Sequence, residues 1–154
     1  MKEPRRPQQA SLRRSVSAAY YALFHLLVGE AVRRILAGGA RNALRHCLSR
    51  AFDHAVMKRV ARQFAEQGLS PKLEPGLNGL PLQDEIVQVA AAFVDLQQQR
   101  HEADYDMGRS FTRLEVLSLI SDAERAMIEW RKVRCSVQAD TFLVGLLAFE
   151  KIRL

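Results

Sequence analysis

The chain has 154 residues, a formal net charge of +6 and a pI near 9.8. Hydrophobic residues make up 48% and charged residues 26%, which are ordinary values for a globular protein. The N-terminus lacks the apolar core of a signal peptide, the apolar run at residues 16–29 is too short to span a membrane, and the two cysteines have no partners at metal-ligand spacing. We therefore expect a soluble, cytoplasmic protein without metal or cofactor, with a flexible N-terminus at residues 1–8 and one domain over residues 9–154.

Apolar residues recur at three- and four-residue steps, which predicts helices along most of the chain. The first should span residues 9–37, with His25 inside its apolar stripe as a hydrogen-bonded core residue. Three more should follow, near residues 41–67, 84–105 and 111–135, the last with Leu114 and Leu117 among its core positions. The predicted fold class is all-α, an up-and-down antiparallel bundle of four to five helices.

Two further stretches connect or follow these helices. Residues 69–82 hold three prolines and two glycines, which predicts an irregular crossover loop. Residues 141–152 are strongly apolar but short for an independent helix, so they must cover the bundle or a second subunit. Because the apolar side chains of this segment and of the first helix exceed the needs of one core, we expect a homodimer, with an interface above roughly 1,000 Å².

A row of basic side chains winds around the predicted second helix at strict four-residue steps. Such a row drifts around a helix of 3.6 residues per turn, so it forms a ridge and not a flat face. Cationic side chains in this arrangement could contact nucleic-acid phosphates, while the alternative is a solvated helix face. The proposed nucleic-acid-binding residues are His46, Arg50, His54, Lys58 and Arg62.

The predicted third helix ends in a dense set of ionisable groups, residues 100–106. Arg100 and Asp104 are four residues apart and share one face of a helix, whereas His101 points away from that face. Tyr105 reaches the pair only if the helix ends there, which the following Gly108 favours. This cluster is either a salt bridge at a helix end or a polar site facing a cleft.

Two stretches of this sequence resemble the signatures of HEPN domain proteins. Residues 17–25, Ser-Ala-Ala-Tyr-Tyr-Ala-Leu-Phe-His, resemble a first-helix run of the form AYYA-x-FH. Residues 100–105, Arg-His-Glu-Ala-Asp-Tyr, resemble the R-x-x-ADY signature of one HEPN branch, and the order and separation of the two stretches suit that branch. The resemblance implies a HEPN-like up-and-down bundle of four to five helices, usually dimeric, and an RNA-directed function.

The resemblance also implies partners and chemistry. Many HEPN proteins are ribonucleases of toxin–antitoxin, CRISPR or other defence systems, and are often encoded beside a small nucleotidyltransferase. Active members carry an arginine followed, after four to six residues, by a histidine. Here Tyr105, Asp106 and Met107 occupy those positions after Arg100, and the match at Arg41 and His46 falls on the predicted second helix. In the family, a tyrosine near the motif can receive a nucleotidyl group, and Tyr105 is the candidate here.

Metal-independent RNA cleavage needs a base, an acid and a cation that stabilises the charged phosphorane. Arg100 can supply the cation, and the base could be His101, His46 or Asp104. The candidate catalytic residues are Arg100, Asp104, Tyr105 and His101.

Three functions follow from these residues. The first is a HEPN module that binds RNA or a nucleotidyltransferase partner with little or no catalysis. The second is an RNA endonuclease, such as a toxin, with Arg100 in a site at a dimer interface. The third is a non-catalytic helical adaptor that binds another protein through its apolar C-terminal segment.

Overall fold

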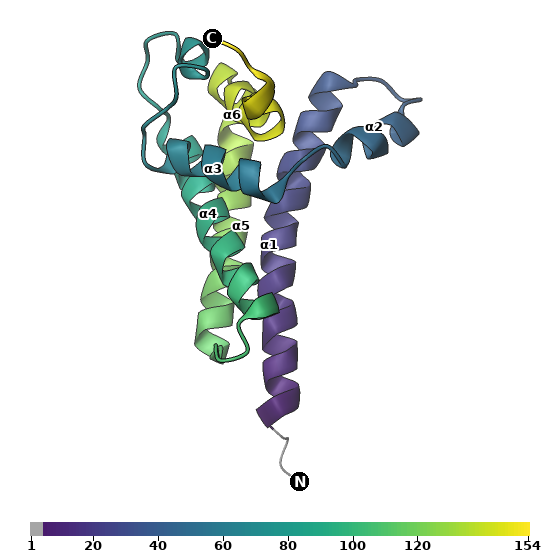
Figure 1. Cartoon of the computed structure of the whole chain (residues 1–154), viewed down its shortest axis with the longest axis vertical. Coiled ribbons are helices and arrows are strands. Elements are labelled where there is room, and N and C mark those ends of the chain that lie inside the picture. Colours follow the sequence, from purple (N-terminus) through teal and green to yellow (C-terminus); the bar gives the residue numbers. More distant parts are fainter. Residues whose placement is uncertain (1–4) are drawn as a thin grey trace.

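The computed structural model describes the backbone of residues 5–154 and the side chains of residues 8–154. Within this range the chain forms only helices and connecting loops, which confirms the predicted all-α class. The α-helices and the two short 3₁₀ helices are α1 (Arg5–Ile35), α2 (Asn42–Ser49), α3 (His54–Ala65), η1 (Glu74–Leu77), α4 (Asp84–Tyr105), α5 (Arg113–Val133), α6 (Val137–Ala148) and η2 (Phe149–Lys151) (Figure 1).

Three long helices form the body of the molecule. Figure 1 shows α1 rising from the N-terminus, α4 returning beside it and α5 rising again, so these three helices follow the predicted up-and-down order. α3 lies across this body and packs against α4 and α6, which departs from a bundle in which every helix is antiparallel to the next. One continuous core joins them, with fully buried Tyr20 and Leu23 from α1, Phe93 and Leu96 from α4, and Trp130 from α5.

The first helix begins earlier than its apolar pattern predicts. α1 starts at Arg5, although the apolar stripe starts only after Gln9. The helix thus includes residues 5–8 of the N-terminal segment that the sequence predicts to be flexible, and residues 1–4 lie outside the described residues. His25 is also exposed, stacked on Tyr21 at 5.7 Å between ring centroids, and is not the core histidine that its position in the stripe predicts.

The predicted second helix is two helices separated by residues 50–53. Asp53 has an extended backbone (φ −114°, ψ 125°), and its Oδ1 accepts hydrogen bonds from the backbone N–H groups of Ala55 and Val56 at 2.8 and 3.1 Å. This is the geometry of a helix N-cap, so Asp53 starts α3 as a separate helix. The apolar spacing runs through the break, and for that reason periodicity alone predicted one helix.

The buried face of α5 differs from the predicted one. Thr112 and Glu115 form a capping box at its start, and Val116, Leu119 and Ala123 lie in the core. Leu114 and Leu117 are 79% and 53% exposed, so the prediction that they are core positions is wrong. Apolar residues occur on both sides of this helix, and the spacing does not say which side faces the other helices.

The strongly apolar C-terminal segment forms α6, which covers one end of the bundle. Phe142 and Leu146 are fully buried, which confirms that this segment covers the core. A Cβ atom at Gly145 would lie 2.9 Å from the Val60 side chain and 3.0 Å from that of Leu73. The missing side chain at Gly145 therefore lets α6 approach α3 and the crossover loop closely.

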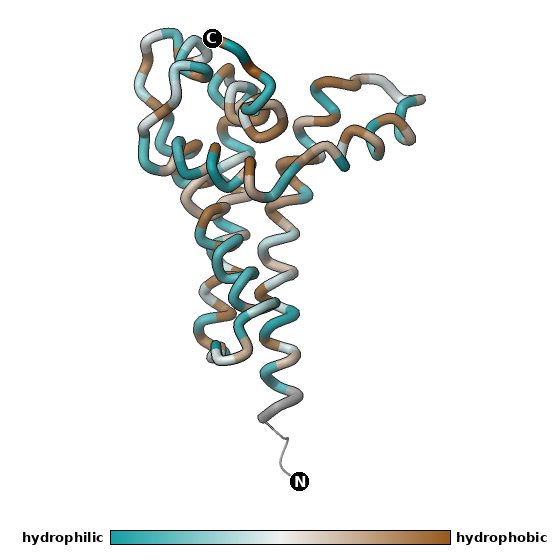
Figure 2. Tube along the Cα trace, in the orientation of Figure 1, coloured by the Kyte–Doolittle hydropathy of each residue, from teal (hydrophilic) through white to brown (hydrophobic). Residues whose placement is uncertain are grey.

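α2 projects from the bundle as an arm (Figure 1). None of its residues is buried, although it carries apolar as well as polar positions (Figure 2). Arg45 holds it to the preceding turn, because its Nε donates to the carbonyl of Leu36 at 2.8 Å and its Nη1 donates to the Asn42 side chain at 2.8 Å.

Candidate functional site

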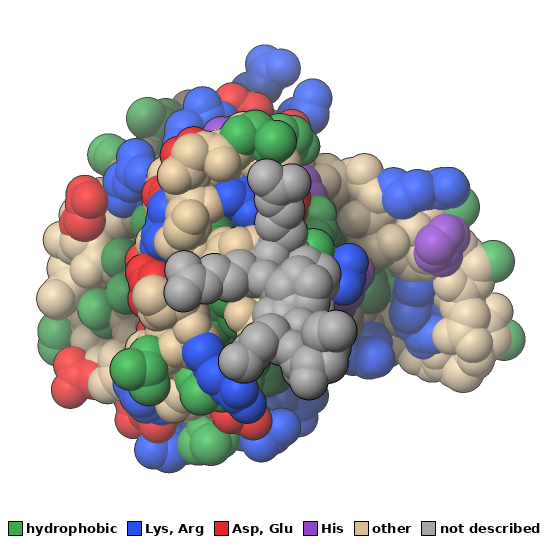
Figure 3. Space-filling model, turned by 90° about the horizontal axis from the view of Figure 1, so that it is seen from below, with side chains coloured by type: hydrophobic (Ala, Val, Ile, Leu, Met, Phe, Trp, Pro, Cys, Tyr) green, Lys and Arg blue, Asp and Glu red, His purple; other side chains and the backbone are tan. Residues whose placement is uncertain are grey.

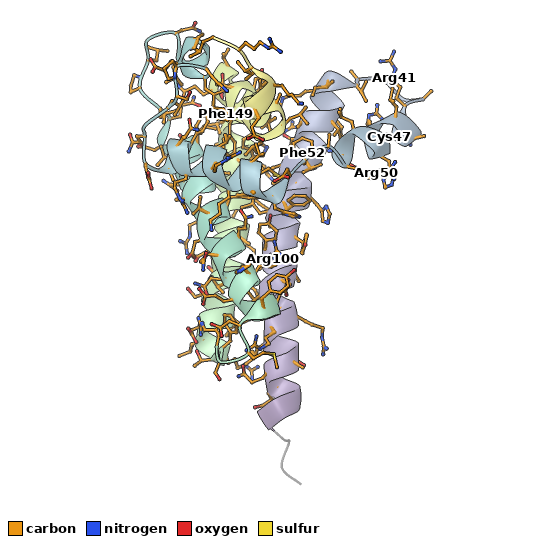
Figure 4. The ribbon with its side chains drawn as sticks, in the orientation of Figure 1. Arg41, Cys47, Arg50, Phe52, Arg100 and Phe149 are labelled. Carbon is orange, nitrogen blue, oxygen red and sulfur yellow. The ribbon has the colours of Figure 1, made fainter. Side chains whose placement is uncertain are left out.

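Arg100 lies under two tyrosine rings of α1 (Figure 4). Its guanidinium carbon is 5.1 Å from the ring centroid of Tyr20 and 5.7 Å from that of Tyr21, which is the distance range of cation–π contacts. Nη1 of Arg100 is 3.3 Å from Oδ2 of Asp104, and the Ser17 hydroxyl donates to Oδ1 of Asp104 at 2.9 Å. Only 11% of the Arg100 side chain is exposed, so this ion pair is not the solvated surface pair that its spacing suggests.

Tyr20, whose ring contacts Arg100, also forms a polar contact with His54 through its hydroxyl group. The Tyr20 hydroxyl is 2.6 Å from Nδ1 of His54, and the imidazole stacks on Phe24 at 4.7 Å between ring centroids. Burial raises the pKa of Tyr20, while burial and the charge of Arg100 lower the pKa of His54. Both groups are therefore neutral near pH 7 and share one hydrogen bond, whose direction depends on the tautomer of His54.

Two polar atoms beside this cluster have no hydrogen-bond partner in the described part of the chain. They are Oε1 of Gln97 and Nε of Arg100, one helical turn apart on α4. The side-chain amide nitrogen of Gln97 donates to the backbone carbonyl of His54 at 2.9 Å. The cluster thus combines a held cation, a neutral imidazole, a neutral phenol and unused hydrogen-bonding capacity.

The predicted site residues separate into two groups. Arg100 and Asp104 meet Ser17, Tyr20 and Tyr21 between α1 and α4. His101 and Tyr105 are exposed and contact each other, with their ring centroids 5.0 Å apart. Tyr105 therefore does not join the Arg100–Asp104 pair, although α4 does end at this residue.

The end of α4 is held by an arginine of the first helix. Nη1 of Arg13 donates to the carbonyl of Ala103 at 2.7 Å, and its Nη2 donates to the carbonyls of Asp106 and Arg109. These bonds satisfy carbonyl groups that a helix end leaves free. A cavity of about 750 Å³ lies beside them and is lined partly by Asp104 and Met107. Arg100 does not line it.

The sequence did not reveal the contacts of Tyr20, Tyr21 and His54 with Arg100. A signal was present in the AYYA run, because adjacent residues of a helix point about 100° apart, so its two rings lie on neighbouring faces of the helix. Tyr20 is fully buried and Tyr21 is half-buried, and together they cover the guanidinium.

The predicted basic ridge is not continuous. His46 lies on the projecting α2 and Arg50 is its C-cap residue, whereas Lys58 and Arg62 lie on α3 beyond the Asp53 break. His54, between them in sequence, is half-buried and bonds to Tyr20 of α1, so it does not join the exposed cations of this row.

The positive charge is nevertheless concentrated on this part of the chain. Residues 31–65, from the end of α1 through α3, contain eight Lys and Arg residues and a single acid, Asp53. The rest of the chain contains 15 Lys and Arg residues and 16 acids, so it is almost neutral. On the face seen in Figure 3, the projecting arm shows Lys, Arg and His side chains, while the acids lie on the body of the bundle.

Only α1, among the described helices, is long and apolar enough to cross a membrane by length and composition. The stretch lies within residues 8–35, where an 18-residue window has a mean hydropathy of 1.3 and is 56% buried inside the bundle. This burial is typical of a core helix in a soluble protein.

Comparison of the chain with protein-family models, with curated proteins and with solved structures gave no match.

Proposed function

We propose that this protein is an RNA-binding helical bundle of the HEPN type, which contacts phosphates through its basic segment, residues 31–65. The observation that carries the proposal is the separation of charge, because nearly all of the excess positive charge lies in this segment. Phosphate neutralisation by Lys and Arg supplies most of the affinity in non-specific nucleic-acid binding.

The arm places several of these cations away from competing acids. Arg41, His46 and Arg50 are exposed, and none of them forms an ion pair with an acid in the described residues (Figure 4). By contrast, Arg59 is paired with Glu150 at 2.7 Å, and Lys58 donates to Gln98 at 3.1 Å. The arm is therefore the part of the basic segment that we assign to phosphate contacts.

The test is the salt dependence of RNA binding. A double variant, Arg41→Glu with Arg50→Glu, should reduce the slope of log affinity against log salt concentration by about 1.4, from about 0.7 per lost phosphate contact on single strands. The control is Arg113→Glu with Arg125→Glu, which makes the same change in net charge on α5, where both side chains are exposed. Equal losses of affinity in the two variants would show that RNA affinity depends only on the net charge of the protein, and this result would overturn the proposed interface.

A second candidate function, RNA cleavage, is favoured by the Arg100 cluster. The guanidinium is held in place and keeps an unpartnered Nε, and the neutral His54 shares the Tyr20 ring with it. A cation and a neutral imidazole that acts as the base are two of the three groups that metal-independent cleavage needs. This arrangement makes His54 a better candidate for the base than His101 or His46, because the latter two lie outside the cluster.

Cleavage is tested by incubating the protein with total RNA and comparing the wild type with Arg100→Ala and His54→Gln. Circular dichroism must show that each variant is folded. The catalytic function is supported if the wild type cleaves the RNA and both folded variants do not. It is excluded under these conditions if the RNA stays intact with the wild type.

The remaining expected partner is a nucleotidyltransferase. Tyr105 is 68% exposed at the end of α4, so its hydroxyl is accessible to another enzyme. In such a transfer the tyrosine oxygen attacks the α-phosphate of a nucleoside triphosphate and pyrophosphate leaves. Intact mass after co-expression with a partner enzyme tests this role: a nucleotidyl mass increase that Tyr105→Phe abolishes supports it. If the mass is unchanged and the two proteins also fail to copurify, the proposal of a nucleotidyltransferase partner is wrong. An adaptor function would then require a partner protein other than a nucleotidyltransferase.

A further inference from the structure

The arm is amphipathic, and its apolar side is uncovered. Ala43, Leu44, Cys47 and Leu48 fall on one side of α2 at helical spacing. The first three are exposed, Leu44 by 53%, and Leu48 is only partly covered. Of the basic residues of the proposed RNA interface, His46 lies away from this stripe, while Arg41 and Arg50 flank α2 at its two ends, with Nη2 of Arg50 3.6 Å from Sγ of Cys47. Phosphate binding at these residues leaves the exposed Leu44 without a partner.

The same chain contains an apolar groove between α1 and α6, which we call the α1/α6 groove. It encloses about 550 Å³ and is lined chiefly by aliphatic residues, of which Ile35 and Val144 are 51% and 48% exposed. At its edge Nε of Arg34 is 2.8 Å from Oδ1 of Asp140. Asp140 compensates the charge of Arg34, so the edge of the groove does not repel a basic helix. The lining residues are Ala31, Ile35, Leu143, Val144, Leu147 and Ala148.

The arm and the groove match in length. Along α6 the groove reaches from Asp140 to Ala148, about 12 Å at 1.5 Å per residue. α2 has eight residues and is also about 12 Å long. Both features lie at the same end of the bundle, the end where α1 meets α2 and α6 (Figure 1).

We propose that two copies of this chain exchange arms, the apolar stripe of each α2 lying in the α1/α6 groove of the partner. Exchange between identical chains forms two equal contacts around a two-fold axis and closes the assembly. The groove could also be filled by another protein, but only a second copy supplies an unpartnered helix of the right length and chemistry from the chain itself. Arg41 and Arg50 lie at the two ends of each arm and not in the stripe itself, so the dimer would present two sets of phosphate contacts beside the exchanged arms.

Disulfide trapping tests this arrangement and uses the native, exposed Cys47 on the arm. In a Cys135→Ser background, one chain keeps Cys47, and the other carries Cys47→Ser with Val144→Cys. Mild oxidation of the mixture should produce a dimer that a thiol reductant separates. The control replaces Val144→Cys with Leu114→Cys, because Leu114 is 79% exposed at the opposite end of the bundle.

Cross-linking at Val144→Cys at least tenfold faster than at Leu114→Cys supports the proposal. Equal rates would reflect random collision and overturn it.

A second variant, Leu44→Asp, should weaken the dimer at least tenfold by light scattering while leaving the helical content unchanged. A wild-type monomer at about 100 µM would overturn the arm exchange. The salt-slope test of the RNA interface can still be read on that monomer, because it needs only one copy of the arm.

Discussion

Arg100 shows how a residue that looks exposed in the sequence can be covered in the fold. Its i,i+4 partner Asp104 is the kind of neighbour that contributes little at a surface. In the structure the guanidinium also stacks on Tyr20 and Tyr21, and that contact depends on its planar shape.

We expect Arg100→Lys to lower the free energy of unfolding by about 1–2 kcal/mol, because a lysine keeps the charge but loses the planar stacking. The measurement is urea denaturation, with Arg125→Lys as the exposed control, for which we expect a change below about 0.5 kcal/mol. If the cluster is purely structural, RNA affinity of the folded variant stays at the wild-type value. An Arg100→Lys protein of full stability would show that the stacking contributes nothing.

Glu30 is a buried acid held by three side chains. Its Oε1 accepts from Trp130 Nε1 at 2.8 Å, and Arg134 donates to both of its carboxylate oxygens at 2.8 and 2.9 Å. Arg34 approaches to 3.5 Å. The hydrogen bonds from Arg134, followed by that from Trp130, hold the pKa of Glu30 below its ordinary value of 4.5 despite burial.

We expect Glu30→Gln to cost about 1–3 kcal/mol near neutral pH, since it weakens hydrogen bonds to a charged group. Because the pKa is lowered in the folded state, the contribution of Glu30 is complete above pH 4.5 and is lost as the pH falls through the folded value. The stability gap between wild type and variant should therefore close in acid. Urea denaturation at neutral pH and at about pH 3 checks this, and a gap that widens in acid would contradict it.

Among the elements, the break between α2 and α3 has the largest consequence. It turns α2 outward as an arm and brings His54 against Tyr20. A continuous helix over residues 41–67 would have carried the basic residues in one winding row. The break is fixed locally, by the N-cap bonds of Asp53.

Asp53→Ala should destabilise the protein by about 1 kcal/mol, because two backbone N–H groups at the start of α3 lose their acceptor. Thermal unfolding followed by circular dichroism measures the loss. Glu66→Ala, at the exposed other end of α3, is the matched control and should change stability by less than about 0.5 kcal/mol. Equal effects of the two substitutions would mean that the cap does not stabilise α3.

In the whole molecule, the hydrophobic core and the excess positive charge lie largely in different parts of the chain. The bundle body buries one shared core and is nearly neutral, while the basic segment carries the excess charge. The basic segment thus favours contact with an anionic polymer over the nearly neutral remainder of the chain.

Because one core joins all the long helices, unfolding should be a single cooperative transition. Trp130, the only tryptophan, is fully buried in that core, so its fluorescence reports tertiary packing. Urea curves from fluorescence and from far-ultraviolet circular dichroism should coincide. Separate midpoints would show that part of the helical structure unfolds independently of the core.

The sequence was informative where structure is determined by near neighbours. The α4 boundaries, residues 84–105, match the prediction, because acids in the first turn and the residues after Tyr105 mark its ends. The irregular stretch at 69–82 was equally clear from its prolines and glycines. The Asp53 cap was also a local signal, but the apolar spacing that continues past it concealed the break.

By itself, then, the sequence determined the helical class, most helix ends and the position of the positive charge, since these depend on local spacing and composition. The tertiary structure decided which side of α5 is buried, that Arg100 is covered and that His54 faces inward. Those outcomes depend on contacts between helices far apart in the chain, such as Tyr20 of α1 with Arg100 of α4 and His54 of α3. No periodicity within one helix specifies which neighbour will cover it.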